Sequence, residues 1–549
     1  MFQLSNDPLT RWKSVQARLS NTIKEYTEAC AILERSLNRY SCVDGGFSQF
    51  DSLLANLVQH EVKLQEARLN LNKARNLSLS FPPIHKLHPE LLTMIFTLVT
   101  QEWIGPDFQS TGNKPGSATT LASVCFPWRR LLLGSPVFWS QINIVLNGPL
   151  AEMSYRRAKT WAERARRAPL WLTIRDTTDV KDFDKPPKNE PVPNSVLQKA
   201  LRFTAPLMPF VRSLSVNFQD YSPGLTVRSF LASWIRRGSP KVAKRLELRN
   251  DLGFREVQVQ AISPQSQTEA ISTTEFSDFL RSLQSVHIEN IAVDWSNTIF
   301  SGLTDLCIEV ACAPRQIPSQ QDIARLLAAS PHLRRLIIYC FSVTPSYPTP
   351  APVALDHLEQ LGLETMSAGD VAHILPLIST TSNALRVAIS LGNTPEFVDA
   401  ARSFFARTKV TVLHVDGGLP ISHPTISSLF ARMPFLHTLI IRVSICSEEV
   451  SDEFTRWCTI RGELVNPWPA LRTLSLFHCE FTTESLLKLV SPLALHTIGI
   501  CGVEYPAQNE RWSRSDRARI EGELSQKGVH IIWHDISENN VPSWSFVML

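Results

Sequence analysis

Two pairs of histidines have the spacing of metal ligands. His85 and His88 are three residues apart, and His530 and His534 are four residues apart. A structural zinc site needs further ligands, and no cysteine or carboxylate with regular zinc spacing completes either pair. We therefore interpret these residues as structural histidines and expect no bound metal and no cofactor.

Enzyme motifs are not found in the sequence. The chain has no G-x-x-x-x-G-K-[ST], G-x-G-x-x-G or G-x-S-x-G segment, so no recognisable motif holds a phosphate or presents a serine nucleophile. Cys307 ends a predicted strand and Cys312 follows it, and no sequence signature links either thiol to a general base. A thiol in such a place usually fills the core. The protein is not expected to be an enzyme, and a hidden hydrolase or transferase is the weakest alternative.

The composition is that of a folded, globular protein. Its 549 residues suffice for roughly two to four structural units, and 44% of them are hydrophobic against 19% charged. Lys and Arg number 55 and Asp and Glu number 51. The resulting net charge of +4 is too small to predict nucleic-acid binding as the main activity.

Cysteine usage and the lack of apolar runs indicate the compartment. Ten cysteines are scattered without a C-x-x-C pair, which favours reduced thiols. The first residues do not have the pattern of a secretory signal, and no run of about 18 apolar residues predicts a membrane span. We expect a protein of the cytoplasm or the nucleus, with no membrane partner.

Residues 1–80 are predicted to be helical. Apolar residues recur at intervals of three and four between Pro8 and Tyr40 and again up to about Leu77, and Gly45-Gly46 permits a turn between the two helices. Two such helices can fold back on each other as an antiparallel hairpin. With fewer than about four clean heptads, a simple helical tail is favoured over a coiled coil, and self-association through these helices is the alternative.

From residue 196 to residue 549 the chain is organised by a repeat of the form L-x-x-L-x-L. Helix-length apolar segments lie between the copies, so each unit is a strand followed by a helix. From Leu306 onward the middle positions are 24 to 35 residues apart, and a weaker copy begins at Leu385 with Ala388 in the middle. Leucine-rich repeats typically have about 20–29 residues. The other copies are Val211/Leu214/Val216, Ala243/Leu246/Leu248, Leu283/Val286/Ile288, Leu303/Leu306/Ile308, Leu333/Leu336/Ile338, Leu358/Leu361/Leu363, Val410/Leu413/Val415, Leu436/Leu439/Ile441, Leu471/Leu474/Leu476 and Leu495/Ile498/Ile500.

The repeat predicts a mixed α and β fold. One strand and one helix cannot bury their apolar faces alone, whereas stacked copies share a continuous core. The expected structure is an irregular α/β leucine-rich-repeat solenoid, with a parallel sheet on the concave face and helices on the convex face. Leucines in the middle of the copies should be buried, among them Leu336, Leu361, Leu439 and Leu474.

Side chains that alternate with the buried leucines should line the concave face. Their mixture of both charges with Tyr and Phe suggests a protein target. The predicted concave positions are Asp305, Glu309, Arg335, Ile337, Tyr339, Gln360, Glu364, His414, Asp416, Thr438, Arg442, Thr473 and Phe477. The residues expected to contact the target are Arg335, Tyr339, Gln360, Glu364, His414, Asp416, Arg442 and Phe477.

Residues 82–145 are predicted to form a small, separate, all-helical unit after the Pro82-Pro83 break. Pro89 and Glu90 begin a helix at a position where a missing donor and a negative charge are both favourable, and the apolar residues that follow give it one broad apolar face. So small a unit has too few partners to cover this helix. Some of the apolar residues must form the local core, and others are expected to bind another helical protein.

Residues 82–142 closely resemble the F-box. The family pattern is a leader ending in L-P-x-E-[LI]-[LI]-x-x-I-F, a gap, and V-C-x-x-W-R-x-L with a later Pro and Trp. His88 stands where the family commonly has a second Pro or a small residue, and the gap at Gly105–Thr120 is longer than usual. Fourteen residues match in order: Leu87, Pro89, Glu90, Leu91, Leu92, Ile95, Phe96, Val124, Cys125, Trp128, Arg129, Leu132, Pro136 and Trp139.

N-terminal helices, an F-box and leucine-rich repeats in this order are similar to the expanded F-box family of mushroom-forming fungi. The resemblance implies a non-catalytic substrate receptor of a cullin–RING (SCF-type) ubiquitin ligase, with a Skp-type adaptor on the F-box and a target protein on the repeats. A protein-interaction scaffold outside any ligase is the alternative. The resemblance assigns the adaptor contact to Leu87, Pro89, Glu90, Leu91, Ile95, Phe96, Val124, Cys125, Trp128, Arg129 and Trp139.

Residues 146–195 are predicted to be a basic linker helix followed by a loop. Tyr155 and Trp161 recur at packing intervals among the basic residues, which favours a solvated helix face beside the F-box over a nuclear localisation patch. The basic residues are Arg156, Arg157, Lys159, Arg164, Arg166 and Arg167.

Overall fold

The computed structural model describes most of the chain. The described residues are 8–37, 47–77, 84, 87–101, 117–148, 150–175, 192–218, 224–250, 273–291, 295, 300–309, 317–392, 394–417, 433–443, 459–460, 463–464, 468–477, 483–490, 493–501 and 514–534. The chain divides into two compact units: Met1–His88 with Cys125–Pro127, and Pro89–Val124 with Trp128–Leu549.

Helices occur along the whole chain, and none of the described ones is both long and apolar enough to cross a membrane. The helices are α1 (Pro8–Leu37), α2 (Phe47–Leu77), α3 (Pro89–Gln101), α4 (Ser117–Val124), α5 (Phe126–Gly134), α6 (Ala151–Ala165), α7 (Asn194–Thr204), α8 (Gly224–Arg237), α9 (Thr273–Arg281), α10 (Gln320–Ala328), α11 (Ala368–Ile374), α12 (Pro395–Arg407), α15 (Thr483–Val490) and α16 (Arg514–Gln526), with the 3-10 helices η4 (Pro136–Trp139), η5 (Met208–Phe210) and η7 (Leu375–Leu377).

In the part of the chain that the structure describes, strands begin after the first five helices. They are β1 (Gln141–Val145), β2 (Leu170–Arg175), β3 (Val211–Phe218), β4 (Arg245–Asn250), β5 (Ser285–Glu289), β6 (Asp305–Glu309), β7 (Arg335–Tyr339), β8 (Val353–Ala354), β9 (Gln360–Glu364), β10 (Ile378–Ser379), β11 (Leu385–Ser390), β12 (Val410–Gly417), β13 (Thr438–Val443), β14 (Thr459–Ile460), β15 (Glu463–Leu464), β16 (Thr473–Phe477), β17 (Thr497–Cys501) and β18 (His530–His534).

The first unit is dominated by the two long helices α1 and α2, of 30 and 31 residues. Both lie within the range that the apolar spacing predicts to be helical. Many of their large apolar side chains are exposed, among them Trp12 and Leu19 on α1 and Leu57 on α2. Self-association through these helices stays a prediction.

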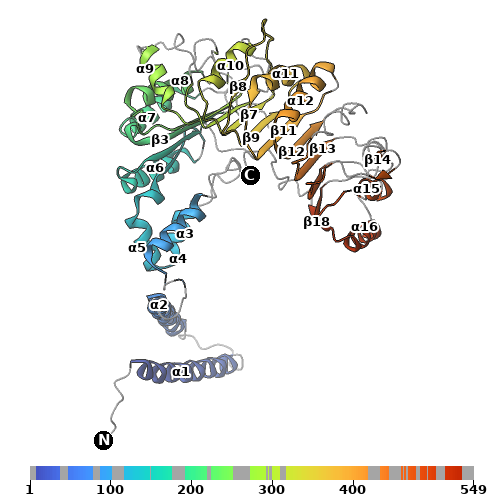
Figure 1. Cartoon of the computed structure of the whole chain (residues 1–549). Helices are drawn as coiled ribbons and strands as arrows, with labels where there is room; N and C mark the ends of the chain where they lie inside the picture. Colours follow the sequence, from blue (N-terminus) through green and yellow to red (C-terminus); the bar gives the residue numbers. More distant parts are fainter. Residues whose placement is uncertain are drawn as a thin grey trace. The chain divides into compact units, whose positions relative to one another are not determined.

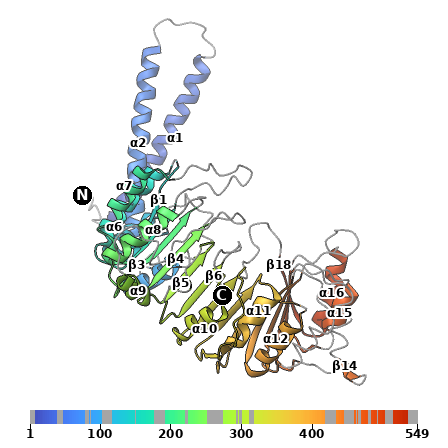
Figure 2. The same ribbon diagram turned by 90° about the horizontal axis from the view of Figure 1, so that it is seen from above.

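The second unit contains one sheet of fourteen strands, in the order β1-β2-β3-β4-β5-β6-β7-β9-β11-β12-β13-β16-β17-β18. Neighbouring strands in it are parallel. The strands lie side by side along an arc, and the helices from α7 to α12 lie on its outer side (Figure 1, Figure 2). The predicted mixed α and β fold with a large parallel sheet is confirmed, and this arrangement is consistent with an α/β repeat solenoid.

The pairing register explains why leucines recur in the sequence. Leu306, Leu336 and Leu361 occupy equivalent positions on β6, β7 and β9, so they form one continuous apolar row. Stacking such rows removes the side chains from water, which is the main stabilising effect in a repeat fold. The predicted burial of Leu336, Leu361, Leu439 and Leu474 is confirmed.

The sheet starts earlier and ends later than the repeat pattern predicts. β1 lies within the range predicted as the helical unit 82–145, and β2 lies within the predicted linker 146–195, so those boundaries cut through the sheet. The pattern is disguised in β1 because Trp139 occupies the first leucine position ahead of Ile142 and Ile144. β18 adds a fourteenth strand after the last predicted copy.

The repeat pattern places the weak copy at Leu385 one residue out of register. Val387, and not Ala388, pairs with Leu413 in the apolar row. The register shifts beside Leu385, which pairs with Val410, and the extra residue is accommodated there as a bulge. The predicted helix 426–433 lies outside the described residues, apart from its last residue.

Candidate interaction surfaces

An aromatic core holds the small helical region against the start of the sheet. Phe96 on α3 contacts Trp128 on α5, with ring centroids 4.7 Å apart. The indole Nε1 of Trp139 donates a hydrogen bond of 2.8 Å to the carbonyl of Leu132. The guanidinium of Arg164 on α6 lies 4.4 Å from the centroid of the Trp139 ring, so this residue of the predicted solvated helix face packs on the aromatic core.

The apolar side chains of α3 divide between this core and the solvent. Leu92 and Phe96 are buried, whereas Leu91, Ile95 and Leu98 are exposed. The exposed three follow the i, i+4, i+7 spacing of one helical stripe. Two further exposed apolar residues on the same helix are Met94 and Val99. An exposed apolar face on a short helix indicates an interaction site.

The predicted adaptor-contact residues fall into three groups. Phe96, Cys125 and Trp139 are at most 8% exposed, so their side chains hold the fold and offer no accessible surface. Leu87 and Trp128 are half-buried. The exposed members are Pro89, Glu90, Leu91, Ile95, Val124 and Arg129.

The sequence reasoning places Val99 on the apolar face of α3 but misses two more exposed apolar residues. Met94 and Leu98 lie outside the family pattern, but helical spacing from Leu91 and Ile95 would have found them. Leu98 and Met94 are the most exposed apolar side chains of the helix, at 61% and 63%.

The second candidate surface is the inner face of the sheet, formed by the side chains that alternate with the buried leucines. Arg335, Ile337 and Tyr339 on β7 belong to this face by the period-two rule. Ile337 is nevertheless buried, in a cluster with Cys307 on β6 and Ala388 on β11. The centre of the inner face is therefore packed rather than open to solvent.

Crowding also buries three of the residues predicted to contact a target. His414 and Glu364 pair with each other, and His414 Nδ1 lies 2.7 Å from Glu364 Oε1. They belong to the strands on either side of β11, where His414 pairs with the small Ala388 and Ala388 in turn pairs with Gly362, two residues before Glu364. Phe477 packs against Ile440. The prediction that Glu364, His414 and Phe477 are contact residues is wrong, because all three are buried.

The other predicted contact residues keep accessible surface. Arg442 is exposed, and Tyr339, Gln360 and Asp416 are partly exposed. Arg335 is partly exposed too, although its Nε lies 3.3 Å from Asp305 Oδ1. Both charge signs and an aromatic side chain thus lie on one face, a composition that suits a protein partner.

A denser charged cluster, not singled out from the sequence, lies on β4 and β5. Arg249 is at its centre, with its Nε 2.7 Å from Glu247 Oε1 and 3.6 Å from Glu289 Oε2. Arg245 also contacts Glu247, at 3.4 Å. A nitrogen of Arg249 is 3.3 Å from His287 Nδ1, and since guanidinium can only donate, Nδ1 accepts.

Burial and the neighbouring charges shift the pKa values in this cluster. Burial, followed by the charge of Arg249, lowers the pKa of His287 to about 3, so the imidazole is neutral. Burial opposes ionisation of Glu247, but Arg249 and Arg245 outweigh it and keep its pKa below the ordinary value. On the adjacent strand, burial and the charge of Glu309 raise the pKa of the Cys307 thiol to about 12, which disfavours the reactive thiolate.

The histidine pairs considered for metal binding are not brought together. His530 and His534 are the two ends of β18, so a rise of about 3.3 Å per residue keeps them too far apart to share an ion. His88 is exposed, and its predicted partner His85 lies outside the described residues, as does Cys312.

Comparison with known proteins adds little. No family model matches the chain, and no curated protein matches it. Among solved structures, the chain is similar to one described as the crystal structure of the Rad7 and Elc1 complex in yeast, with 12% sequence identity and a TM-score of 0.37. The match covers 84% of this chain and 94% of that chain. A likeness of this degree carries no functional argument.

Proposed function

We propose that this protein is a non-catalytic substrate receptor of a cullin–RING ubiquitin ligase. In this proposal α3 docks on a Skp-type adaptor, and the inner face of the sheet binds a target protein. The observation that supports it is the exposed apolar stripe of Leu91, Ile95 and Leu98, in the segment that resembles the F-box.

The packing of α3 makes the stripe a rigid docking surface. Phe96 holds the opposite side of the helix against Trp128 and Phe138, with ring centroids 4.7 and 6.5 Å apart. A helix fixed in this way loses little conformational freedom when a partner covers it, which favours binding. Apolar residues at i, i+4 and i+7 suit a partner with an apolar helical groove or face.

The inner face supplies the second half of the proposal. Tyr339 and Arg442 are residue types enriched where proteins bind proteins, and they lie on a face that carries both charge signs, which suits a protein partner better than nucleic acid. A target held there, with the adaptor on α3, would have its lysines at a high effective concentration next to a ubiquitin-charged partner. The chain itself then needs no catalytic residue.

A quantitative pull-down tests the adaptor contact. We expect the wild-type chain to retain a recombinant Skp-type adaptor at micromolar concentration, and a Leu91→Ala/Leu98→Ala double variant to bind severalfold or more weakly, because truncating apolar anchors typically costs more than about 1 kcal/mol. Ile532→Ala is the matched control, since Ile532 is an exposed apolar residue on β18. Circular dichroism first establishes that each variant is folded.

Two outcomes would overturn the proposal. If the wild-type chain does not retain the adaptor, the protein is better described as an interaction scaffold outside the ligase. If the double variant binds as tightly as Ile532→Ala, α3 is not the docking surface.

A further inference from the structure

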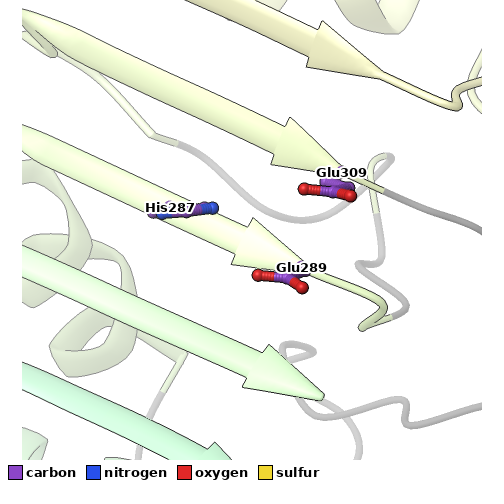
Figure 3. Close-up of side chains that lie close together, drawn as sticks. All are labelled: His287, Glu289 and Glu309. Carbon is purple, nitrogen blue, oxygen red and sulfur yellow. The ribbon is translucent and has the colours of Figure 1, made fainter. Parts of the chain in front are cut away.

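Three side chains with metal-binding chemistry meet on the inner face of the sheet, where β5 and β6 run side by side. His287 and Glu289 are two residues apart on β5, so they point to the same face. Glu309 on β6 pairs with Glu289 in the strand register. One ligating atom from each of the three lies within 4.8 Å of the others. Figure 3 shows the three side chains together on the two neighbouring strands.

His287 has a nitrogen that the protein does not use. The residue is only 9% exposed, and its Nε2 is buried without a hydrogen-bond partner among the described residues. Burying a polar atom without a partner costs free energy, commonly about 1–3 kcal/mol, so such an atom calls for an explanation. A ligand that the nitrogen could bind would supply one.

The charges around His287 leave one carboxylate uncompensated. Arg249 and Arg245 face Glu247, and Arg249 also reaches Glu289. Glu309 is in no ion pair within the part of the chain that the structure describes. Three carboxylates of the cluster therefore share two guanidinium groups.

We propose that His287, Glu289 and Glu309 bind a divalent transition-metal cation, with zinc as the expected ion. Imidazole nitrogen and carboxylate oxygen are ordinary zinc ligands, and three protein ligands leave a fourth position for water or for a group of a bound partner. The inference does not depend on the adaptor contact proposed for α3.

Metal binding requires one local rearrangement. Since Nδ1 accepts from Arg249 in the structure, the neutral imidazole carries its proton on Nε2. When the metal takes Nε2, the proton moves to Nδ1 and needs an acceptor. Glu247 lies opposite His287 in the register of β4 and β5, and a carboxylate in this position would orient the ring as it commonly does for metal-bound histidine. Arg249 gives up the 3.3 Å contact to His287 and retains the shorter one to Glu247.

The test uses cobalt(II) as a spectroscopic probe for zinc, on the full chain. We expect one ion per chain and a spectrum without the thiolate charge-transfer band that binding to cysteine would give. Glu309→Gln should weaken binding about tenfold or more, because removing a ligand costs at least as much as removing a group behind it. Glu364→Gln is the matched control, since Glu364 faces His414 on the same side of the sheet.

A second variant and a second readout keep the test decisive. His287→Asn removes the nitrogen ligand without altering either acid, and it should also weaken binding about tenfold or more. Zinc should raise the melting temperature of the wild type and of Glu364→Gln but not of Glu309→Gln. Absence of cobalt binding, a thiolate spectrum, or equal affinities for Glu309→Gln and Glu364→Gln would overturn the proposal.

Discussion

Leu361→Ala is the substitution that tests the packing of the repeat sheet most severely. Leu361 is in β9, near the middle of the sheet, and its side chain is 0% exposed. Its register neighbours are Leu336 on β7 and Val387 on β11, which are equally inaccessible. The change removes three carbon atoms from the centre of this apolar row.

The structure allows the cost to be worked out. Loss of three buried carbons at about 0.8 kcal/mol each gives roughly 2.4 kcal/mol of transfer free energy. A cavity adds to this cost, because strands hydrogen-bonded on both sides cannot move in to fill it. We expect Leu361→Ala to lower the free energy of unfolding by about 3–5 kcal/mol.

Denaturant unfolding followed by circular dichroism measures this difference. Leu98→Ala is the control, because the same chemical change at a side chain that is 61% exposed should alter the unfolding free energy by less than about 0.5 kcal/mol. Repeat proteins can unfold in steps, so amide exchange in β7, β9 and β11 should also rise for Leu361→Ala. Equal unfolding curves for Leu361→Ala and Leu98→Ala would refute the assignment of this row to the core.

Three further predictions concern single residues. Thr394→Ala should destabilise the protein by about 1 kcal/mol in denaturant unfolding, because Thr394 Oγ1 accepts a hydrogen bond of 3.3 Å from the amide of Phe397 at the start of α12; an unchanged midpoint would contradict the cap. Gly392→Ala should cost about 1–3 kcal/mol, since a Cβ there would collide with the Cβ of Ala368, and a melting temperature equal to the wild type would contradict this close packing. Burial, and then the charge of Glu152, raises the pKa of Tyr155 to about 12 from 10.0. The folded state thus retains the Tyr155 proton to a higher pH than the unfolded state does, so the stability that comes from the neutral phenol is present below pH 10 and is lost as the pH rises towards 12. The unfolding free energy of Tyr155→Phe should lack that loss when it is measured against pH, and identical profiles for the variant and the wild type would contradict the pKa shift.

The sequence predicts the sheet well because the leucines recur at the positions that pair with one another on neighbouring strands. Leu336 and Leu361 recur because each strand must present its apolar side to the same core. The pattern fails where another residue type occupies a buried leucine position, as Trp139 does before β1. It also fails where the spacing changes by one residue, as at Leu385, because a bulge is a property of the paired strands.

The inner face shows a second limit of sequence reasoning. Period-two alternation correctly separates Tyr339 from its leucine neighbours, but it does not indicate how much space neighbouring strands leave. Glu364 on β9 and His414 on β12 are far apart in the sequence and are not register partners, so alternation alone does not reveal that they meet across β11. Aligning the strand copies would have placed Glu289 beside Glu309, whereas the unused nitrogen of His287 is visible only in the structure.

Amide hydrogen exchange of the full chain, with and without a recombinant Skp-type adaptor, tests the proposed docking on α3 most directly. Docking should slow exchange in Pro89–Gln101 when the adaptor is added, while β9 and β11 exchange as before. A complex that forms without slowing exchange in α3, or an adaptor that leaves the exchange of the whole chain unchanged, would contradict the proposed docking on α3.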